Sequence, residues 1–353
     1  MEVTSPATGE KILLKGPESA RQFISEAFAG RIHQDPFALR NRSHEPGDWR
    51  DDPSDAVTEL MEAPAERIPT NIRPIDDAVA IRKGELIGIL GYTGCGKSRL
   101  GRTVSYNAMR DGRNVLHIVT EGGGRKVERV RYSVAHAHHL DPQRAQALGI
   151  TFKAYADQIL NPEAMAFLQE AIQDLSRQEG GITVVSPMER TWQGVRRIIE
   201  SETRKRKIDL LNIDYLTHLV PTTARDPRTA MATVIHEAQD LAAVYDHGKG
   251  LALLTPVQGN RKGYEAAQSA GGAWTSEGLF EYSAFVMDCD LLLYVYADDD
   301  LRPLNQIKVG TAKARSSIGM PCTTFKVDKF TQMVVNPTSS NEDFTMDDVL
   351  ELI

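Results

Sequence analysis

One run of eight residues in this chain carries glycines, a lysine and a serine at the spacing of a phosphate-binding loop. The run consists of Gly91, Tyr92, Thr93, Gly94, Cys95, Gly96, Lys97 and Ser98. It fits the pattern G-x-x-x-x-G-K-[ST], in which backbone N–H groups converge on phosphate oxygens. Lys97 is expected to reach the β- and γ-phosphates, and the Ser98 hydroxyl is expected to ligate Mg²⁺. With Arg99, these residues are the predicted nucleotide-binding set, and ATP with Mg²⁺ is the predicted ligand.

The residues on either side of this run supply the right context. Residues 85–90 form a short apolar segment of the buried-strand type, and residues 99–104 can open a helix. A strand, a glycine loop and a helix in this order confirm the motif, because the helix N-terminus adds partial positive charge to the loop. We therefore expect a functional P-loop here.

Two carboxylates follow other buried strands. Glu121 comes after the apolar run Val115–Val119, and Asp214 ends the run that begins at Leu210. The carboxyl ends of parallel strands meet at the edge where open α/β sheets bind ligands, so both side chains are expected beside the P-loop. Glu121 is predicted to polarise the attacking water, and Asp214 to lie on the metal side with Ser98. The alternative for Glu121 is a helix-capping or ion-paired role.

Three polar side chains later in the chain could complete the site. Gln258 follows a buried strand and could sense the γ-phosphate, although a locally satisfied strand-end amide is an equal alternative. Lys313 and Arg315 come just after the predicted strand Gln306–Gly310, and in an extended segment they point the same way. In a ring, both could reach the triphosphate of the next subunit, where an arginine stabilises the transition state. From spacing alone, a solvated surface pair is the favoured interpretation.

The elements that must position these residues alternate between strands and helices. Continuous apolar runs of this kind are typical of a parallel sheet covered on both faces. The predicted parallel strands are Leu86–Leu90, Val115–Val119, Ile182–Val185, Leu210–Ile213, Leu251–Thr255 and Leu291–Tyr296. Helices lie between them, including Thr229–Tyr245. Three shorter strands, predicted to be antiparallel, follow at Gln306–Gly310, Thr323–Val327 and Met333–Val335.

Composition divides the chain into three parts. Residues 1–67 are predicted to form an N-terminal arm or linker with short helices at 19–28 and 55–62, which packs on its own core or on a neighbouring subunit. Residues 68–336 carry all the motifs and form the predicted ATPase domain. Residues 337–353 form an acidic tail without a cation. The tail is a candidate docking segment for a protein partner, and disorder or packing on the core are equal alternatives.

Bulk properties narrow the class of protein further. The chain has 353 residues and a formal net charge of −7, so any surface for nucleic acid must be local. Three cysteines without paired spacing indicate a reducing compartment and no structural zinc. No apolar run approaches the ~20 residues of a membrane span, and no signal-peptide pattern is present. The cytoplasm is therefore the predicted location, with no membrane partner.

The order of these motifs resembles that of DnaB-type replicative helicases. After the P-loop come Thr120-Glu121, Ile213-Asp214-Tyr215-Leu216, Gln258-Gly259-Asn260-Arg261 and Lys313-Ala314-Arg315-Ser316-Ser317-Ile318-Gly319. The resemblance is to the C-terminal ATPase domain of that family and covers residues 68–336. Its most specific parts are the Asp-Tyr-Leu block and the Gln-x-Asn-Arg block.

The resemblance implies an α/β fold with a RecA-like P-loop NTPase core. In this fold a mainly parallel twisted sheet is flanked by helices, with a C-terminal antiparallel extension. It also implies a homo-oligomer, six subunits in a ring, with ATP sites between subunits and single-stranded DNA in the centre. By position, Glu121 resembles the catalytic glutamate and Gln258 the γ-phosphate sensor. Lys313 and Arg315 resemble the pair that acts on the neighbouring subunit.

The resemblance also suggests how this chain would meet DNA and other proteins. The segment 262–284 corresponds to the central DNA-binding loop of the family. Lys262 and the neighbouring Arg261 are its cations, and they are the candidate DNA contacts. Primase, polymerase or a helicase loader are the partners implied for the tail, in a bacterial or phage-infected cell.

The predicted function is an ATP hydrolase of the DNA helicase type, a ring-forming motor that moves on single-stranded DNA. One alternative is a RecA-like recombinase or recombination mediator, which would form filaments. A second is a KaiC-like ATPase that responds to protein partners and does not depend on DNA. A third is a nucleotide-gated scaffold without catalysis, against which the presence of Glu121 argues.

Overall fold

The structure is a computed structural model, and it describes residues 2–4, 11–13, 65–121, 123–219, 226–275 and 283–336. Near the N-terminus, β1 (Glu2–Thr4) and β2 (Lys11–Leu13) pair in antiparallel fashion, which the sequence did not predict. The short helices predicted at 19–28 and 55–62 lie outside the described residues, as does the acidic tail at 337–353.

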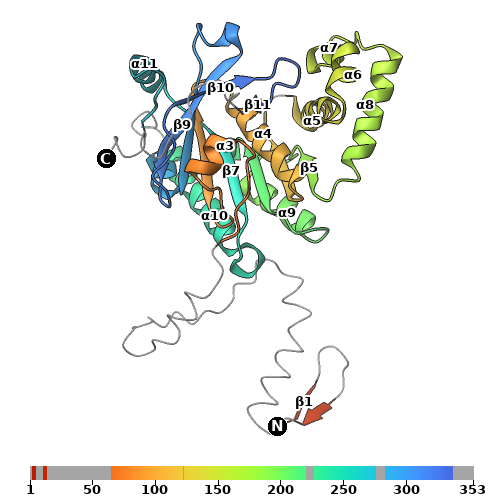
Figure 1. Cartoon of the computed structure of the whole chain (residues 1–353). Coiled ribbons are helices and arrows are strands. Elements are labelled where there is room, and N and C mark those ends of the chain that lie inside the picture. The colour runs from red at the N-terminus through yellow and green to blue at the C-terminus, as the bar shows by residue number, and fades with distance from the viewer. Residues whose placement is uncertain are drawn as a thin grey trace.

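A nine-stranded sheet forms the centre of the molecule (Figure 1). Its strands are β3 (Leu86–Gly91), β4 (Asn114–Val119), β5 (Gly181–Val185), β6 (Leu210–Asp214), β7 (Ala252–Gln258), β8 (Leu291–Tyr296), β9 (Gln306–Ala314), β10 (Thr323–Val327) and β11 (Val334–Val335). The order is β11-β10-β9-β8-β3-β7-β6-β4-β5. Strands β3 to β8 are parallel to one another, and β9, β10 and β11 add to β8 in antiparallel fashion. The predicted fold class is confirmed.

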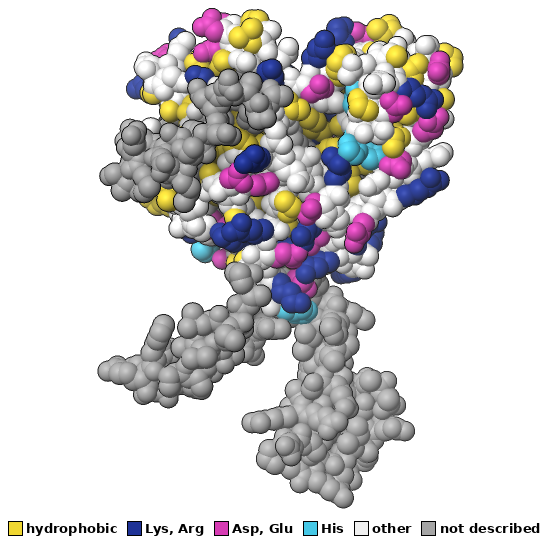
Figure 2. All heavy atoms as spheres, in the orientation of Figure 1, with side chains coloured by type: hydrophobic (Ala, Val, Ile, Leu, Met, Phe, Trp, Pro, Cys, Tyr) yellow, Lys and Arg dark blue, Asp and Glu magenta, His cyan; other side chains and the backbone are white. Residues whose placement is uncertain are grey.

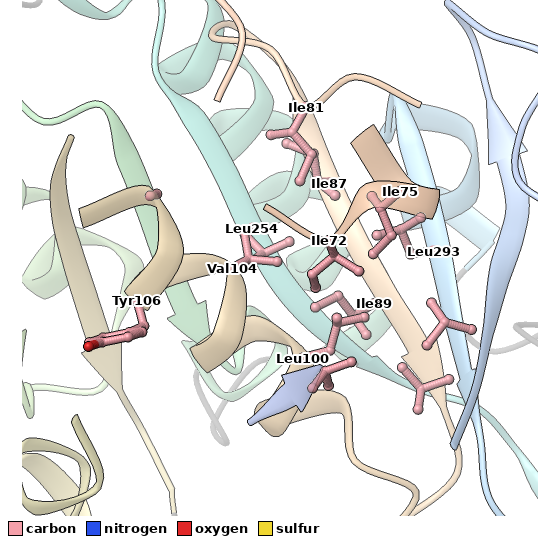
Figure 3. Packing of buried hydrophobic residues seen from close by; sticks show 14 of the residues in the cluster. Ile72, Ile75, Ile81, Ile87, Ile89, Leu100, Val104, Tyr106, Leu254 and Leu293 are labelled. Carbon is pink, nitrogen blue, oxygen red and sulfur yellow. The ribbon is translucent and has the colours of Figure 1, made fainter. Parts of the chain in front are cut away.

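Alternate residues of each central strand enter different hydrophobic clusters, as a sheet covered on both faces requires. On β3, Ile87 and Ile89 belong to one cluster, and Leu86 and Leu90 belong to the other. The first face packs on α3 (Arg73–Ala78), α4 (Lys97–Arg110) and α5 (Gly124–Leu140). Figure 3 shows Ile87 and Ile89 among side chains of α3, α4 and the neighbouring strands. The second face packs on α9 (Trp192–Thr203) and α10 (Pro227–Gly248), where the predicted helix was Thr229–Tyr245.

Four helices form a lobe beside the sheet (Figure 1). They are α5 and the shorter helices α6 (Pro142–Ala147), α7 (Phe152–Ala156) and α8 (Pro162–Leu175). Residues of α5, α6 and α8 share a small apolar cluster. The buried His136 of α5 fastens the lobe to the core. Its Nδ1 lies 2.8 Å from the Tyr106 hydroxyl on α4, and its Nε2 lies 2.7 Å from Asp174 on α8.

Several elements differ from the prediction in ways that concern the site. β9 continues to Ala314, so Lys313 lies within a strand and not after one. The segment 262–284, expected as a DNA-binding loop, overlaps α11 (Arg261–Ser269) and the start of α12 (Ser283–Asp288). The described part of the chain also includes the short 3₁₀ helices η1 (Leu216–Leu219) and η3 (Arg302–Leu304).

The charged side chains on the surface and the polarity of the helices bear on possible partners. On the face drawn in Figure 2, basic and acidic side chains are interspersed. Within the described ranges, no helix is long and apolar enough to cross a membrane.

Candidate functional site

The phosphate-binding loop connects the end of β3 to the start of α4. Gly94 and Gly96 have φ values of 78° and 106°, which lie in the left-handed region that favours glycine. Backbone in this conformation turns successive N–H groups inward and makes a concave anion site at a helix N-terminus. The structure therefore provides the loop shape that the sequence predicted.

A hollow of about 270 Å³ opens beside this loop. It is lined by Gly94, Gly96, Lys97, Ser98, Arg99, Arg102, Arg131, Tyr215 and Gln332. Five of these residues belong to the predicted nucleotide-binding set. The side chain of Cys95, also in that set, is buried in the core, and burial raises the pKa of its thiol. Cys95 therefore packs and does not present a reactive thiolate.

The Lys97 ammonium is held by its own loop. Its Nζ donates to the carbonyl oxygens of Gly91 at 2.9 Å and Tyr92 at 3.0 Å, and it lies 5.8 Å from the centre of the Tyr215 ring. Burial lowers the pKa of Lys97, and the negative charges of Asp214 and Glu121 oppose that change. Phosphate oxygens are stronger acceptors than these neutral carbonyls, so Lys97 is ready to transfer its hydrogen bonds to a phosphate.

Asp214, the last residue of β6, is a buried carboxylate that makes no salt bridge within the described residues. Burial raises its pKa to about 6, although a hydrogen bond with Ser98 lowers it. Its Oδ1 is buried and has no hydrogen-bond partner within the described residues. A cation beside the Ser98 hydroxyl would satisfy this oxygen, because carboxylate and hydroxyl oxygens are the ligands that Mg²⁺ prefers. The residues present fit the predicted Mg²⁺ position.

Glu121 lies just past the end of β4, next to the strand that carries Asp214. Val119 pairs with Asp214 in the parallel ladder. The Glu121 carboxylate is half exposed, and its Oε1 lies 3.2 Å from Nε2 of His218 on η1. Glu121 therefore contacts His218 with the geometry of an ion pair, which is one of the two non-catalytic alternatives, helix capping or ion pairing, that the sequence left open. It leaves the second carboxylate oxygen free for a water.

Gln258 is the last residue of β7 and reaches the phosphate-binding loop. It pairs in the ladder with Gly91, and its Nε2 donates to the Thr93 hydroxyl at 3.0 Å. The Gln258 side chain is exposed, and its amide donates to a residue of the phosphate-binding loop and not to its own strand. The structure therefore brings Gln258, Lys97 and Asp214 to one edge of the sheet.

Aromatic side chains join this loop to α11, where the candidate DNA contacts lie. The Tyr92 ring is 5.0 Å from that of Tyr264 on α11, which in turn stacks on Tyr296 at 5.4 Å. Arg261 and Lys262 form the exposed first turn of α11. Arg261 pairs with Glu265 at 2.9 Å, so its charge is partly compensated in this structure.

Lys313 binds the end of α12. Its Nζ donates to the carbonyl oxygens of Val286 at 2.5 Å, Met287 at 3.1 Å and Cys289 at 2.7 Å. Carbonyls at a helix C-terminus carry partial negative charge, so a lysine caps this end favourably. Lys313 is thus not the solvated surface cation that spacing alone favoured.

Arg315 lies beside Lys313 and far from the phosphate-binding loop of its own chain. It donates to Asp290 Oδ1 at 2.9 Å, and the other oxygen of Asp290 accepts from the backbone N–H of Leu86 at 2.9 Å. Leu86 begins β3, and the loop follows the opposite end of that strand. At about 3.3 Å per residue the two ends are about 17 Å apart. The structure therefore does not bring Lys313 and Arg315 to Lys97 of the same chain.

A buried ion pair beneath the hollow was missed by the sequence analysis. Arg102 donates to both carboxylate oxygens of Glu128, at 2.7 and 3.1 Å, and Arg131 also contacts Glu128. Burial opposes ionisation of Glu128, but Arg102 lowers its pKa to about 2. In the sequence these residues look like ordinary helix-surface charges. His218 was also missed, because one histidine after an Asp-Tyr-Leu block has no recognisable spacing.

The comparisons with known proteins concern the fold. No family model and no curated protein sequence matches the chain. Among solved structures, one described as an ATPase domain matches with a TM-score of 0.63 and 18% identity, over 83% of this chain and 99% of that one. A DnaB-like replicative helicase, described together with its interactions with primase, matches with a TM-score of 0.64 and 16% identity, over 91% of this chain and 72% of that one. The chain therefore has the RecA-like ATPase fold of DnaB-type helicases.

Proposed function

We propose that this protein is an ATP-hydrolysing motor that assembles as a ring and moves on single-stranded DNA, acting as a DNA helicase. The observation that carries the proposal is the unpartnered buried oxygen of Asp214 beside Ser98, at the mouth of a P-loop. A buried carboxylate oxygen without a hydrogen-bond partner fits a cation delivered with a nucleotide. The fold, shared with DnaB-type ATPase domains, supports the same assignment.

The residues of the chain divide the chemical work among them. The loop N–H groups and Lys97 hold the β- and γ-phosphates, and Ser98 with Asp214 would hold Mg²⁺. When bound, Mg²⁺ neutralises charge on the β- and γ-phosphate oxygens. Glu121 orients a water and accepts its proton while the water oxygen bonds to the γ-phosphorus. The bond from that phosphorus to the bridging oxygen breaks, and its electron pair leaves with ADP.

Lys313 and Arg315 act on the site of a neighbouring subunit in this proposal. Their position at the end of the sheet opposite the chain's own P-loop supports a role in trans, because about 17 Å is too far for contact. Arginine supplied by a neighbour stabilises charge that develops on the γ-phosphate. Gln258 would detect the γ-phosphate and, through its loop, influence α11.

DNA and protein partners follow from the same proposal. Single-stranded DNA would pass near residues 262–284, with Arg261 and Lys262 as the candidate contacts from α11. Backbone N–H groups of this segment can also hold DNA phosphates, which suits its small number of cations. The acidic residues 337–353 are the proposed docking segment for primase, polymerase or a loader.

An unwinding assay tests this function. A forked duplex with a single-stranded tail is incubated with the protein and ATP, and strand separation is followed by fluorescence. The proposal expects unwinding by the wild type and none by Lys97→Ala. Strand pairing instead of separation, with filaments in electron micrographs of the DNA complex, would support the recombinase. ATP hydrolysis that proceeds without unwinding and without any effect of DNA would support the partner-regulated ATPase.

A further inference from the structure

We propose that His218 is a positioning residue that orients the Glu121 carboxylate for attack of water on the γ-phosphate. The proposal rests on the ATP hydrolysis proposed above. His218 lies four residues after Asp214, on η1, where the chain turns back over the end of β4. Nothing in the motif pattern marks this position.

The imidazole ring is fixed on three sides. Nε2 lies 3.2 Å from Glu121 Oε1, and Nδ1 lies 3.3 Å from the Thr120 hydroxyl. The ring also packs on Tyr215, with centroids 5.3 Å apart. A ring held at Nδ1 and on its face presents Nε2 in one direction. When both ring nitrogens carry a proton, Nδ1 donates to the Thr120 hydroxyl oxygen, whose own hydrogen goes to the Asp214 carbonyl, and Nε2 donates a hydrogen bond to Glu121.

Glu121 needs such a partner because of where it lies. Its side chain is 51% exposed, and His218 is the one side chain that contacts its carboxylate within the described residues. A carboxylate at a strand end would otherwise turn freely and spend much of its time in unproductive orientations. A hydrogen bond to Oε1 fixes the carboxylate plane and leaves Oε2 to accept the proton of the attacking water.

A purely structural role for His218 does not account for its position. The edge between β4 and β6 is already closed by Thr120, whose hydroxyl donates to the Asp214 carbonyl at 2.9 Å and accepts from the Tyr215 N–H at 2.8 Å. The side chain of His218 is 39% exposed and is not part of the hydrophobic core. Its contacts with Thr120 and Tyr215 hold the ring, and its remaining nitrogen faces Glu121.

Three substitutions at one position separate the two ring nitrogens. His218→Leu removes both, His218→Asn retains a donor near the Nδ1 position, and His218→Gln retains a donor near the Nε2 position. Each is made in the full chain, alone and together with Glu121→Gln. The measurements are steady-state ATP hydrolysis at saturating Mg-ATP and the Kd of a fluorescent ATP analogue. The analogue also shows that each variant folds.

The proposal expects kcat of His218→Leu to fall by about tenfold to a hundredfold, because small misplacement of a reacting group is enough for such a loss. The Kd for nucleotide stays within about twofold, since Glu121 does not hold the phosphates in the ground state. His218→Gln recovers most of kcat, and His218→Asn does not. In the Glu121→Gln background, His218→Leu has no further effect, because the two residues act as one unit.

Other results overturn the proposal. If His218→Leu keeps the wild-type kcat, then His218 does not act through Glu121. The same conclusion follows if His218→Leu lowers kcat by the same factor in the Glu121→Gln background. A rise in Kd with unchanged kcat would make it a nucleotide contact instead. If the wild type itself does not exceed the Lys97→Ala blank, the proposed ATPase function fails first, and that outcome is distinct from all of these.

Discussion

Replacing Asp214 by Asn should make the unfolding free energy of the nucleotide-free protein less dependent on pH. The same substitution should abolish ATP hydrolysis. Burial raises the pKa of this carboxyl from its ordinary value of 3.8 to about 6. A carboxyl with a raised folded pKa stabilises the fold fully below the unfolded pKa, and this contribution is lost as pH rises through the folded pKa. The contribution of Asp214 to the unfolding free energy of the wild type therefore falls by about 3 kcal/mol as the pH rises from below 4 to above 6, at about 1.4 kcal/mol per pKa unit.

Urea unfolding followed by circular dichroism, in EDTA and without nucleotide, measures this difference. Roughly half of the loss lies between pH 5 and pH 8. Over that range the unfolding free energy of the wild type should fall by about 1.5 kcal/mol more than that of Asp214→Asn. The comparison of slopes matters more than the absolute values, because a buried Asn amide has hydrogen-bond needs of its own.

Mg-nucleotide should raise the unfolding free energy of the wild type more than that of Asp214→Asn. At a ligand concentration of 100 times Kd, binding stabilises the wild type by about 2.7 kcal/mol. Asp214→Asn should gain much less, and it should not hydrolyse ATP. Parallel pH slopes for the two proteins in EDTA would show that Asp214 is not a buried carboxyl with a raised pKa.

Three further predictions concern other parts of the chain. Arg315→Ala should abolish ATP turnover and leave nucleotide binding largely intact, as measured by hydrolysis and by binding of a fluorescent analogue; normal hydrolysis would contradict the role in trans. Lys83→Met leaves the carboxylates of Glu66 and Asp209 without their shared partner and should lower the unfolding free energy by about 3 kcal/mol in urea. Gly259→Ala would place a Cβ 2.4 Å from the Trp274 ring and should lower that free energy by about 1–3 kcal/mol, with a changed Trp274 emission; an unchanged spectrum would argue against this packing.

The sequence predicted the central sheet well because its strands leave a simple signal. Runs such as Leu86–Leu90 and Leu291–Tyr296 are apolar at every position, and a strand buried on both faces requires that composition. The ends of strands were less accurate. β9 continues four residues beyond the predicted Gly310, where the residues are small or polar and all partly buried, so no alternation of burial marks a strand.

The candidate site was predicted as far as it follows from the order of the strands. Glu121, Asp214 and Gln258 each come at the end of a parallel strand, so topology alone gathers them at one edge. Residues on helices and turns carry no such mark. Arg102 and His218 reach the site through the packing of α4 and the turn of η1, which short-range spacing does not encode.

The decisive experiment compares ATP hydrolysis with and without single-stranded DNA, with Lys97→Ala as the blank. We expect hydrolysis that single-stranded DNA stimulates strongly and that Lys97→Ala lacks in both conditions. Hydrolysis of equal rate with and without DNA would contradict the claim that this ATPase is a motor on single-stranded DNA.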